Sequence, residues 1–160
     1  MKYFFTFLLL SSFSIHLCYA QTFFDKVLNQ KWVGSGELFG SKASFQMQWQ
    51  MILDGKFWEL SFQNQREQSE EFKFKAKGVY QIKDDEQLKG IWFDSRGITF
   101  PLKGNFSEDS LTIFWGTPET EEGKTIYTVN HNGLISVIDF VLKDKELVPF
   151  ATASYRKAEN

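Results

Sequence analysis

Apolar and polar side chains alternate with a period of two along most of this chain, and this alternation restricts the fold more than any other feature. In the clearest run, from Ser44 to Met51, four polar residues alternate with four apolar ones. Successive side chains of a β-strand point to opposite faces, so this pattern indicates a strand with one buried face. The Asp54-Gly55 pair that follows is typical of a tight hairpin turn.

Similar runs recur to the end of the chain, separated by short turn signals. The predicted strands lie near residues 32–39, 43–53, 56–64, 71–82, 88–94, 98–106, 110–116, 124–129, 134–142 and 146–156. No interval between them offers the roughly dozen residues that a parallel crossover needs, so the strands are antiparallel neighbours. Before them, the apolar spacing of residues 23–30 predicts a short N-terminal helix of about two turns.

About ten antiparallel strands in a meander either pack as two sheets or close on themselves, and closure removes exposed strand edges. We therefore expect an all-β fold, an antiparallel up-and-down barrel of about ten strands, with a two-sheet sandwich as the alternative. If the apolar faces point inward, Gln46, Gln48, Gln50, Gln63 and Asn64 form a solvated outer wall.

The first 20 residues predict a secretory signal peptide. Lys2 supplies a positive start, an apolar stretch follows, and Cys18-Tyr19-Ala20 has the form of a cleavage site. Serines and a histidine interrupt the apolar stretch, which falls short of the roughly 20 apolar residues that span a bilayer. We therefore expect cleavage near Ala20, a single barrel domain over residues 21–160 with no transmembrane anchor, and a secreted or periplasmic location. A secreted domain without disulfides suits a bacterial protein at least as well as a eukaryotic one.

The composition excludes several kinds of chemistry. The only cysteine lies in the predicted signal, which also holds one of the two histidines and leaves His131 as the only imidazole. Disulfides, thiol nucleophiles and metal sites built from several Cys and His ligands are therefore not expected. With 18 basic and 20 acidic residues and no basic stripe, the chain is not expected to bind nucleic acid.

The ends of the predicted barrel carry a family resemblance. Trp32 opens the first strand in a Trp-x-Gly-x-Gly pattern, and Arg156 stands near the end of the last strand. This pairing is similar to the signature of lipocalins and the wider calycins, in which the arginine packs over the tryptophan. The resemblance implies that Trp32 and Arg156 form a structural latch between the first and last strands, which a cation–π contact would stabilise.

Two central segments, Leu53–Phe57 and Gly90–Gly97, resemble a family of small secreted bacterial domains of unknown function that is placed near the nitrobindin-type barrels. The resemblance implies a calycin-like barrel with an interior cavity and, for most members, no established activity. Nitrobindin-type barrels bind haem through a histidine on the barrel wall. His131 instead lies in an Asn-His-Asn-Gly sequence that is typical of a solvated hairpin tip, so no cofactor is expected, and haem is the alternative.

Four tryptophans and one turn are the candidate ligand-binding residues. Trp49, Trp58, Trp92 and Trp115 lie on different predicted strands, where they either line a pocket or fill the interior. Asp94 and Arg96 stand between two apolar strands, where they either bind a polar head group at the barrel mouth or simply form a hairpin turn. Those four residues and this Asp94/Arg96 pair make up the predicted site.

The sequence favours a secreted, non-catalytic barrel that carries or senses a small apolar or amphipathic molecule. The alternative is a protein-binding or inhibitor module with a filled barrel and a protein partner. A third hypothesis is a cofactor-free enzyme, for which a buried ionisable group such as Asp139, close to a Lys or Tyr, would be the sign. A cavity of several hundred Å³ favours the first hypothesis.

Overall fold

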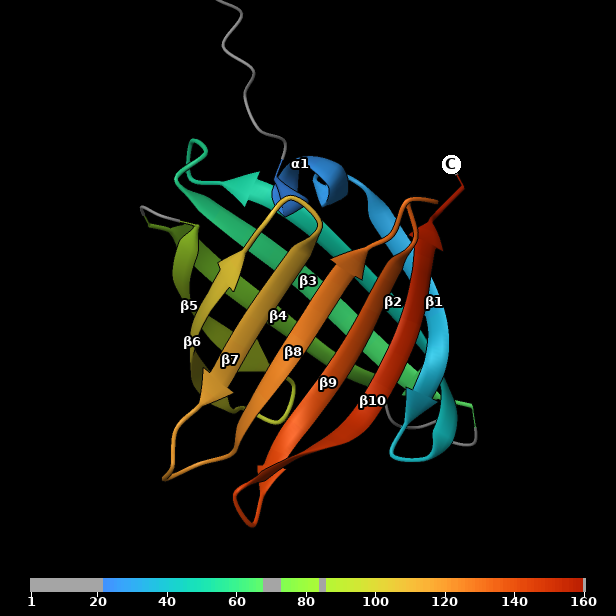
Figure 1. Ribbon diagram of the computed structural model, residues 1–160, viewed down its shortest axis with the longest axis vertical. Coiled ribbons are helices and arrows are strands. Elements are labelled where there is room, and N and C mark those ends of the chain that lie inside the picture. The colour runs from blue at the N-terminus through green and yellow to red at the C-terminus, as the bar shows by residue number, and fades with distance from the viewer. Residues whose placement is uncertain (1–21, 68–72, 84–85, 160) are drawn as a thin grey trace, which may run out of the picture.

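Ten antiparallel strands close into a barrel, which confirms the fold predicted from the alternation (Figure 1). The computed structural model describes residues 22–67, 73–83 and 86–159, so the predicted signal peptide lies outside the described residues. The strands are β1 (Lys31–Leu38), β2 (Ser41–Ile52), β3 (Phe57–Arg66), β4 (Lys73–Ile82), β5 (Gln87–Asp94), β6 (Thr99–Phe106), β7 (Ser110–Gly116), β8 (Glu122–Val129), β9 (Ile135–Lys143) and β10 (Glu146–Lys157). Each strand pairs with its neighbours in the sequence, and β1 pairs with β10 to close the circle.

The apolar faces of the strands point into the barrel. On β2, Phe45, Met47 and Trp49 are at most 3% exposed. Asn64 is an exception to the predicted outer wall of amides, because it lies directly opposite Phe45 in the β2–β3 register and faces inward. Residues directly opposite each other on antiparallel strands share a face, so the strand register corrects what alternation alone suggested for Asn64.

Helix α1 (Phe23–Val27) closes one end of the barrel. Phe23, Phe24 and Val27 are fully buried, and the Trp32 indole donates a hydrogen bond of 3.1 Å to the Val27 carbonyl. The helix is shorter than predicted because Leu28 adopts an extended conformation and bridges to β2 at Trp49. The short helix therefore acts as an apolar plug.

The contact between the first and last strands differs from the expected latch. Lys157 lies opposite Trp32 in the β1–β10 register, and its ammonium is 5.9 Å from the centre of the Trp32 ring. Arg156 lies opposite Val33, so it is on the other face of the sheet, where it forms an exposed ion pair of 3.7 Å with Glu159. The cation that packs over Trp32 is therefore Lys157, in place of the expected Arg156.

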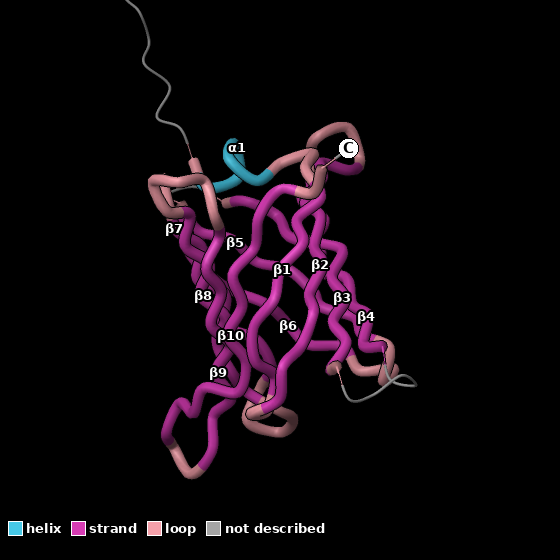
Figure 2. The backbone as a smooth tube through the Cα atoms, turned by 90° about the vertical axis from the view of Figure 1, so that its right-hand side faces the viewer, coloured by secondary structure: helices cyan, strands magenta, loops and turns pink. Residues whose placement is uncertain are grey.

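The two ends of the barrel differ in their connections. Helix α1 lies at the end where β1 begins, while the hairpin turns that follow β1, β5, β7 and β9 lie at the opposite end. Figure 2 shows the β9–β10 hairpin extending beyond the rest of the wall at that opposite end. Within the described residues, no helix has the length and apolar character needed to cross a bilayer.

Candidate functional site

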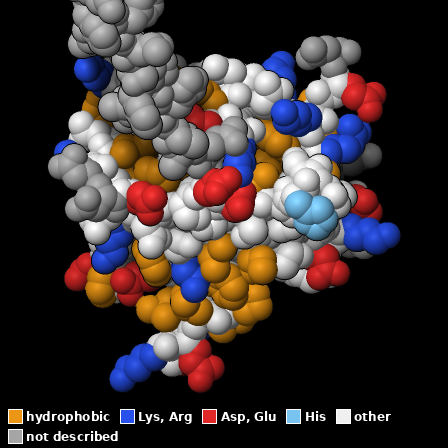
Figure 3. Space-filling view, turned by 45° about the horizontal axis from the view of Figure 1, so that its top comes forward, with side chains coloured by type: hydrophobic (Ala, Val, Ile, Leu, Met, Phe, Trp, Pro, Cys, Tyr) orange, Lys and Arg blue, Asp and Glu red, His pale blue; other side chains and the backbone are white. Residues whose placement is uncertain are grey.

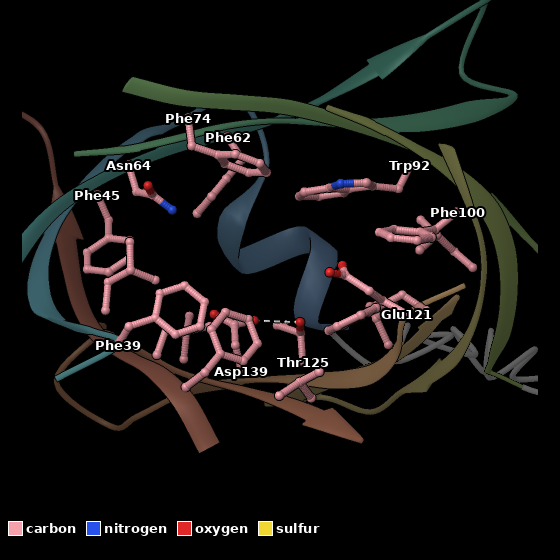
Figure 4. A pocket seen from close by; sticks show the side chains of 18 of the residues that line it. Phe39, Phe45, Phe62, Asn64, Phe74, Trp92, Phe100, Glu121, Thr125 and Asp139 are labelled. Carbon is pink, nitrogen blue, oxygen red and sulfur yellow. Dashed lines mark hydrogen bonds between the residues drawn. The ribbon is translucent and has the colours of Figure 1, made fainter. Parts of the chain in front are cut away.

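A cavity of about 420 Å³ lies inside the barrel (Figure 4). Its walls come from the strands, and its outer rim includes Phe39, Arg96, Glu121 and Lys143, all from the end opposite α1. The buried side chains of α1 close the other end. The cavity is therefore a pocket with one mouth, framed by hairpin turns.

Two of the four predicted tryptophans line this cavity. Trp92 and Trp115 form part of the wall, with Phe62 6.2 Å from Trp92 and Phe100 5.7 Å from Trp115 between ring centres. Figure 4 shows Phe62, Trp92 and Phe100 arranged around one side of the space. The wall there offers flat aromatic faces to an apolar molecule.

The other two predicted tryptophans pack beneath α1 and do not line the cavity. Trp58 lies 4.5 Å from Phe24, and Trp49 is fully buried against Phe24 and Tyr80. Alternation fixes which face a side chain occupies but not its depth along the barrel. For that reason the sequence did not distinguish these two residues from Trp92 and Trp115.

Glycines inside the wall keep an aromatic-rich barrel hollow. A Cβ atom at Gly123 would lie 2.1 Å from a ring carbon of Trp115, so the indole lies directly against the backbone there. In the same way, a Cβ atom at Gly78 would lie 2.4 Å from the Tyr80 hydroxyl. Both rings therefore lie along the wall rather than across the cavity.

The predicted Asp94/Arg96 pair is both a turn and part of the mouth. Arg96 donates to Asp94 through Nη2 at 2.8 Å and through its backbone N–H at 2.9 Å, and the Trp92 indole donates to the same carboxylate at 3.3 Å. Arg96 also reaches Glu121 of the β7–β8 turn at 3.4 Å. Arg96 and Glu121 line the cavity, whereas the buried Asp94 carboxylate holds Arg96 in place from behind.

The charges of this pair stabilise each other. Burial alone would raise the pKa of Asp94, but the hydrogen bonds and positive charge of Arg96 outweigh burial, so its pKa lies below the ordinary value. Hydrogen bonding to Asp94 likewise raises the pKa of Arg96. Both groups are therefore charged at neutral pH, and Arg96 has its positive charge already matched within the protein.

A second carboxylate, Asp139, lies inside the cavity itself. It comes from the middle of β9, on the inward face shared with Val137 and Val141. Thr125 lies directly opposite on β8 and donates a hydrogen bond of 2.6 Å to Asp139 Oδ1. Burial raises the pKa of Asp139 to about 6, against a smaller lowering by the Thr125 hydrogen bond.

Asp139 was predicted from the sequence only as a sign of catalysis. Three other residues that line the cavity were not predicted: Thr125, Tyr80 and Tyr127. A signal for Asp139 was present, because it interrupts the apolar residues Ile135, Val137 and Val141 at alternate positions of its strand. No comparable signal marked Thr125. The hydroxyls of Tyr80 and Tyr127 form no hydrogen bond with other described residues, and burial raises the pKa of both phenols.

His131 lies far from the cavity. It is exposed on the β8–β9 turn, at the end that α1 closes, and the one histidine of the described residues appears on the molecular surface (Figure 3). The side chain of Asn130 shapes this turn by accepting hydrogen bonds from two backbone N–H groups, each at 3.0 Å. In the described ranges, no cluster of three or more His, Cys, Asp or Glu side chains is arranged to hold a metal ion.

The fold and the site together define a class of protein: a closed, ten-stranded antiparallel barrel with an internal, aromatic-lined cavity that opens at one end. A comparison with known protein families and with curated proteins found no match to this sequence.

Proposed function

We propose that this protein is a secreted or periplasmic barrel of the calycin-like kind that binds a small amphipathic molecule without transforming it, as a carrier or a sensor. The observation that carries the proposal is the cavity of about 420 Å³, closed at one end by α1 and lined by aromatic side chains. Ligand pockets typically enclose roughly 300–1,000 Å³ and combine apolar walls with a few polar groups.

The distribution of polar groups supports an amphipathic rather than a purely apolar ligand. Trp92, Trp115 and Phe62 offer apolar contact area inside the barrel. Charged side chains gather at the mouth, and Thr125 and Asp139 add one polar position farther in. A molecule with an apolar body and at least one polar group would satisfy both kinds of surface.

The cavity also weighs against the alternative of a filled protein-binding module, since a filled barrel would leave no such space. A protein partner would then have to bind the outside of the barrel. The outer wall carries three apolar side chains that are each more than 40% exposed: Ile91, Phe93 and Phe114. Exposed apolar side chains of this kind are typical of protein-binding surfaces.

The raised pKa of Asp139 favours a second candidate, a cofactor-free enzyme in which this carboxylate acts as a general base. The nearest hydrogen-bonding side chain is Thr125, which positions the carboxylate. This candidate would be supported if the wild-type protein chemically changes a bound molecule during incubation and the Asp139→Asn variant does not.

Native mass spectrometry of the protein exported with its own signal tests the carrier proposal. We expect a recurrent non-covalent adduct that is released on denaturation and is lost in Trp92→Ala and Trp115→Ala. Phe93→Ala, which removes an aromatic ring from the outer wall, serves as the control and should retain the adduct. A bare mass, together with unchanged tryptophan fluorescence on addition of fatty acids, alkylamines or haem, would refute the carrier proposal.

A further inference from the structure

Asp139 is a carboxylate inside an aromatic cavity without a positive partner. Its Oδ1 accepts the Thr125 hydrogen bond, while Oδ2 makes no hydrogen bond to any described residue. No ion pair of the described chain includes Asp139, and no cation contributes to its pKa. The carboxylate therefore has one free acceptor oxygen in the enclosed space.

The groups that face Asp139 from neighbouring elements do not supply the missing charge. From β8 and β10 these are the uncharged Thr125, Tyr127 and Tyr155. Asn64 lies on a different wall of the cavity (Figure 4). The charged groups at the mouth are Arg66, Arg96, Glu121 and Lys143.

The cationic side chains at the mouth do not neutralise the negative charge of Asp139. The guanidinium of Arg96 is already paired with Asp94 and Glu121. Arg66 and Lys143 are exposed at the ends of their strands. No described side chain therefore supplies the positive charge that the Asp139 carboxylate lacks, and a bound molecule can supply it.

A cation suits this environment for two independent reasons. An ionised carboxylate removed from water is stabilised strongly by an opposite charge at hydrogen-bond distance. The faces of aromatic rings also attract cations, and Trp92, Trp115 and Phe62 present such faces to the cavity. A carboxylate or phosphate at this depth would instead meet Asp139 as a like charge.

We propose that the cavity is specific for an amphipathic amine, whose ammonium group donates a hydrogen bond to Asp139 Oδ2 and whose apolar part packs against the aromatic wall. This inference rests on the proposed carrier function and names the chemical class of its ligand. Thr125 is then a positioning residue, because its hydrogen bond to Oδ1 orients the carboxylate toward the cavity.

Three probes with the same alkyl chain test this proposal: decylammonium, decanol and decanoate. Their binding at pH 7.5 is followed by calorimetry and by tryptophan fluorescence. We expect decylammonium to bind at least about tenfold more tightly than decanol, as a charge-assisted hydrogen bond implies. Decanoate should bind more weakly than either of the other two.

Asp139→Asn removes the charge with almost no change in shape. It should weaken decylammonium binding at least about tenfold and leave decanol binding unchanged. Asp144→Asn makes the same chemical change on the exposed β9–β10 turn and should alter neither affinity. Circular dichroism verifies that both variants are folded.

The pH dependence of the wild-type protein provides a second measurement that needs no variant. Because the pKa of Asp139 is about 6, the affinity for decylammonium should fall about tenfold between pH 7 and pH 5, while that for decanol should not fall.

The outcomes separate this inference from the function on which it rests. Similar affinities for all three probes, or an unchanged preference in Asp139→Asn, would overturn amine specificity and leave the carrier function standing. Failure of all three probes to bind the wild-type protein would overturn amine specificity, and together with a bare native mass it would overturn both.

Discussion

The hydroxyl of Thr125 lies 2.6 Å from Asp139 Oδ1, across the β8–β9 pair and inside the cavity. Burial raises the pKa of Asp139, and this hydrogen bond to the ionised form opposes the increase. We therefore expect Thr125→Val to raise the pKa of Asp139 above its wild-type value of about 6. Carbon-detected NMR titration of the aspartate carboxyl groups measures the change, and an unchanged pKa would show that the hydroxyl does not act on Asp139.

Asp139 should lower the stability of the protein at neutral pH. Its folded-state pKa of about 6 lies above the ordinary value of 3.8, so between these values the folded state binds more protons than the unfolded state. Stability contributed by this group is therefore present at low pH and is lost as the pH rises to 6. We expect Asp139→Asn to stabilise the protein at pH 7.5, by at most about 3 kcal/mol, and to have little effect near pH 4. Urea denaturation at both pH values gives the comparison, and destabilisation at pH 7.5 would contradict the prediction.

Arg96 should stabilise the mouth mainly by neutralising the buried Asp94 carboxylate. Arg96→Leu leaves that carboxylate without its ionic partner and should lower the free energy of unfolding by about 1–3 kcal/mol. Arg66→Leu at the same end of the barrel is the control, because Arg66 is exposed, and it should change the free energy by less than about 0.5 kcal/mol.

The effect of Arg96 should depend on pH in the opposite sense to that of Asp139. Because the pKa of Asp94 is lowered in the folded state, the stabilisation is complete above the ordinary pKa of this carboxyl and is lost as the pH falls through the lowered value. Arg96→Leu and the wild-type protein should therefore converge in stability in strong acid. A constant difference across the acidic range would assign the effect of Arg96 to packing instead of charge.

Gly123→Ala should destabilise the barrel and reduce its cavity. The added methyl group would meet both the Trp115 ring and, at 2.2 Å, the Phe140 carbonyl oxygen, so both the indole and the backbone of the wall must shift. We expect a loss of about 1–3 kcal/mol in the free energy of unfolding and weaker binding of alkyl probes. Gly133→Asn, at a turn with open space around it, should have little effect, since Asn tolerates its positive φ. Equal stability of Gly123→Ala and the wild type would show that the wall is more adaptable than its close contacts indicate.

Lys157 and Arg156 should contribute unequally to the junction of β1 and β10. Lys157→Met removes the cation over Trp32 and should cost about 0.5 kcal/mol, or a decrease of roughly 1–3 °C in melting temperature. Arg156→Met removes an exposed ion pair and an exposed hydrogen bond to the Lys157 carbonyl, and it should leave the melting temperature nearly unchanged. Differential scanning calorimetry compares the decrease in melting temperature of the two variants. A larger decrease for Arg156→Met would support the Arg156 latch expected from the sequence.

The barrel itself was predictable because its signals are local. Alternation such as that of Phe45, Met47 and Trp49 fixes both the strand and its buried face, and short turns fix the order of the strands. Closure was not determined in the same way, because a barrel and a sandwich share this alternation. The contact between Trp32 and Lys157 depends on the register of two strands at opposite ends of the chain, which no local pattern encodes.

The site was predictable only in part, for a related reason. Trp92 and Trp49 both lie on the inward face of a strand, yet one lines the cavity and the other packs under α1. Their difference arises from the helix that fills one end, a long-range contact. Asp139 did break an apolar pattern within its own strand, whereas its hydrogen bond with Thr125 follows from the β8–β9 register.

Because α1 closes one end of the barrel, the rate of ligand exchange can change without a change in the equilibrium affinity. With one end closed, a molecule enters and leaves by the same route, past the stacked rings of Phe39 and Phe150, which lie 5.1 Å apart at the mouth. A change that affects only this passage alters the barriers to entry and exit equally, so the residence time changes while the dissociation constant does not. Evolution of such a barrel can therefore adjust how long its cargo stays through the mouth and which cargo it selects through the interior.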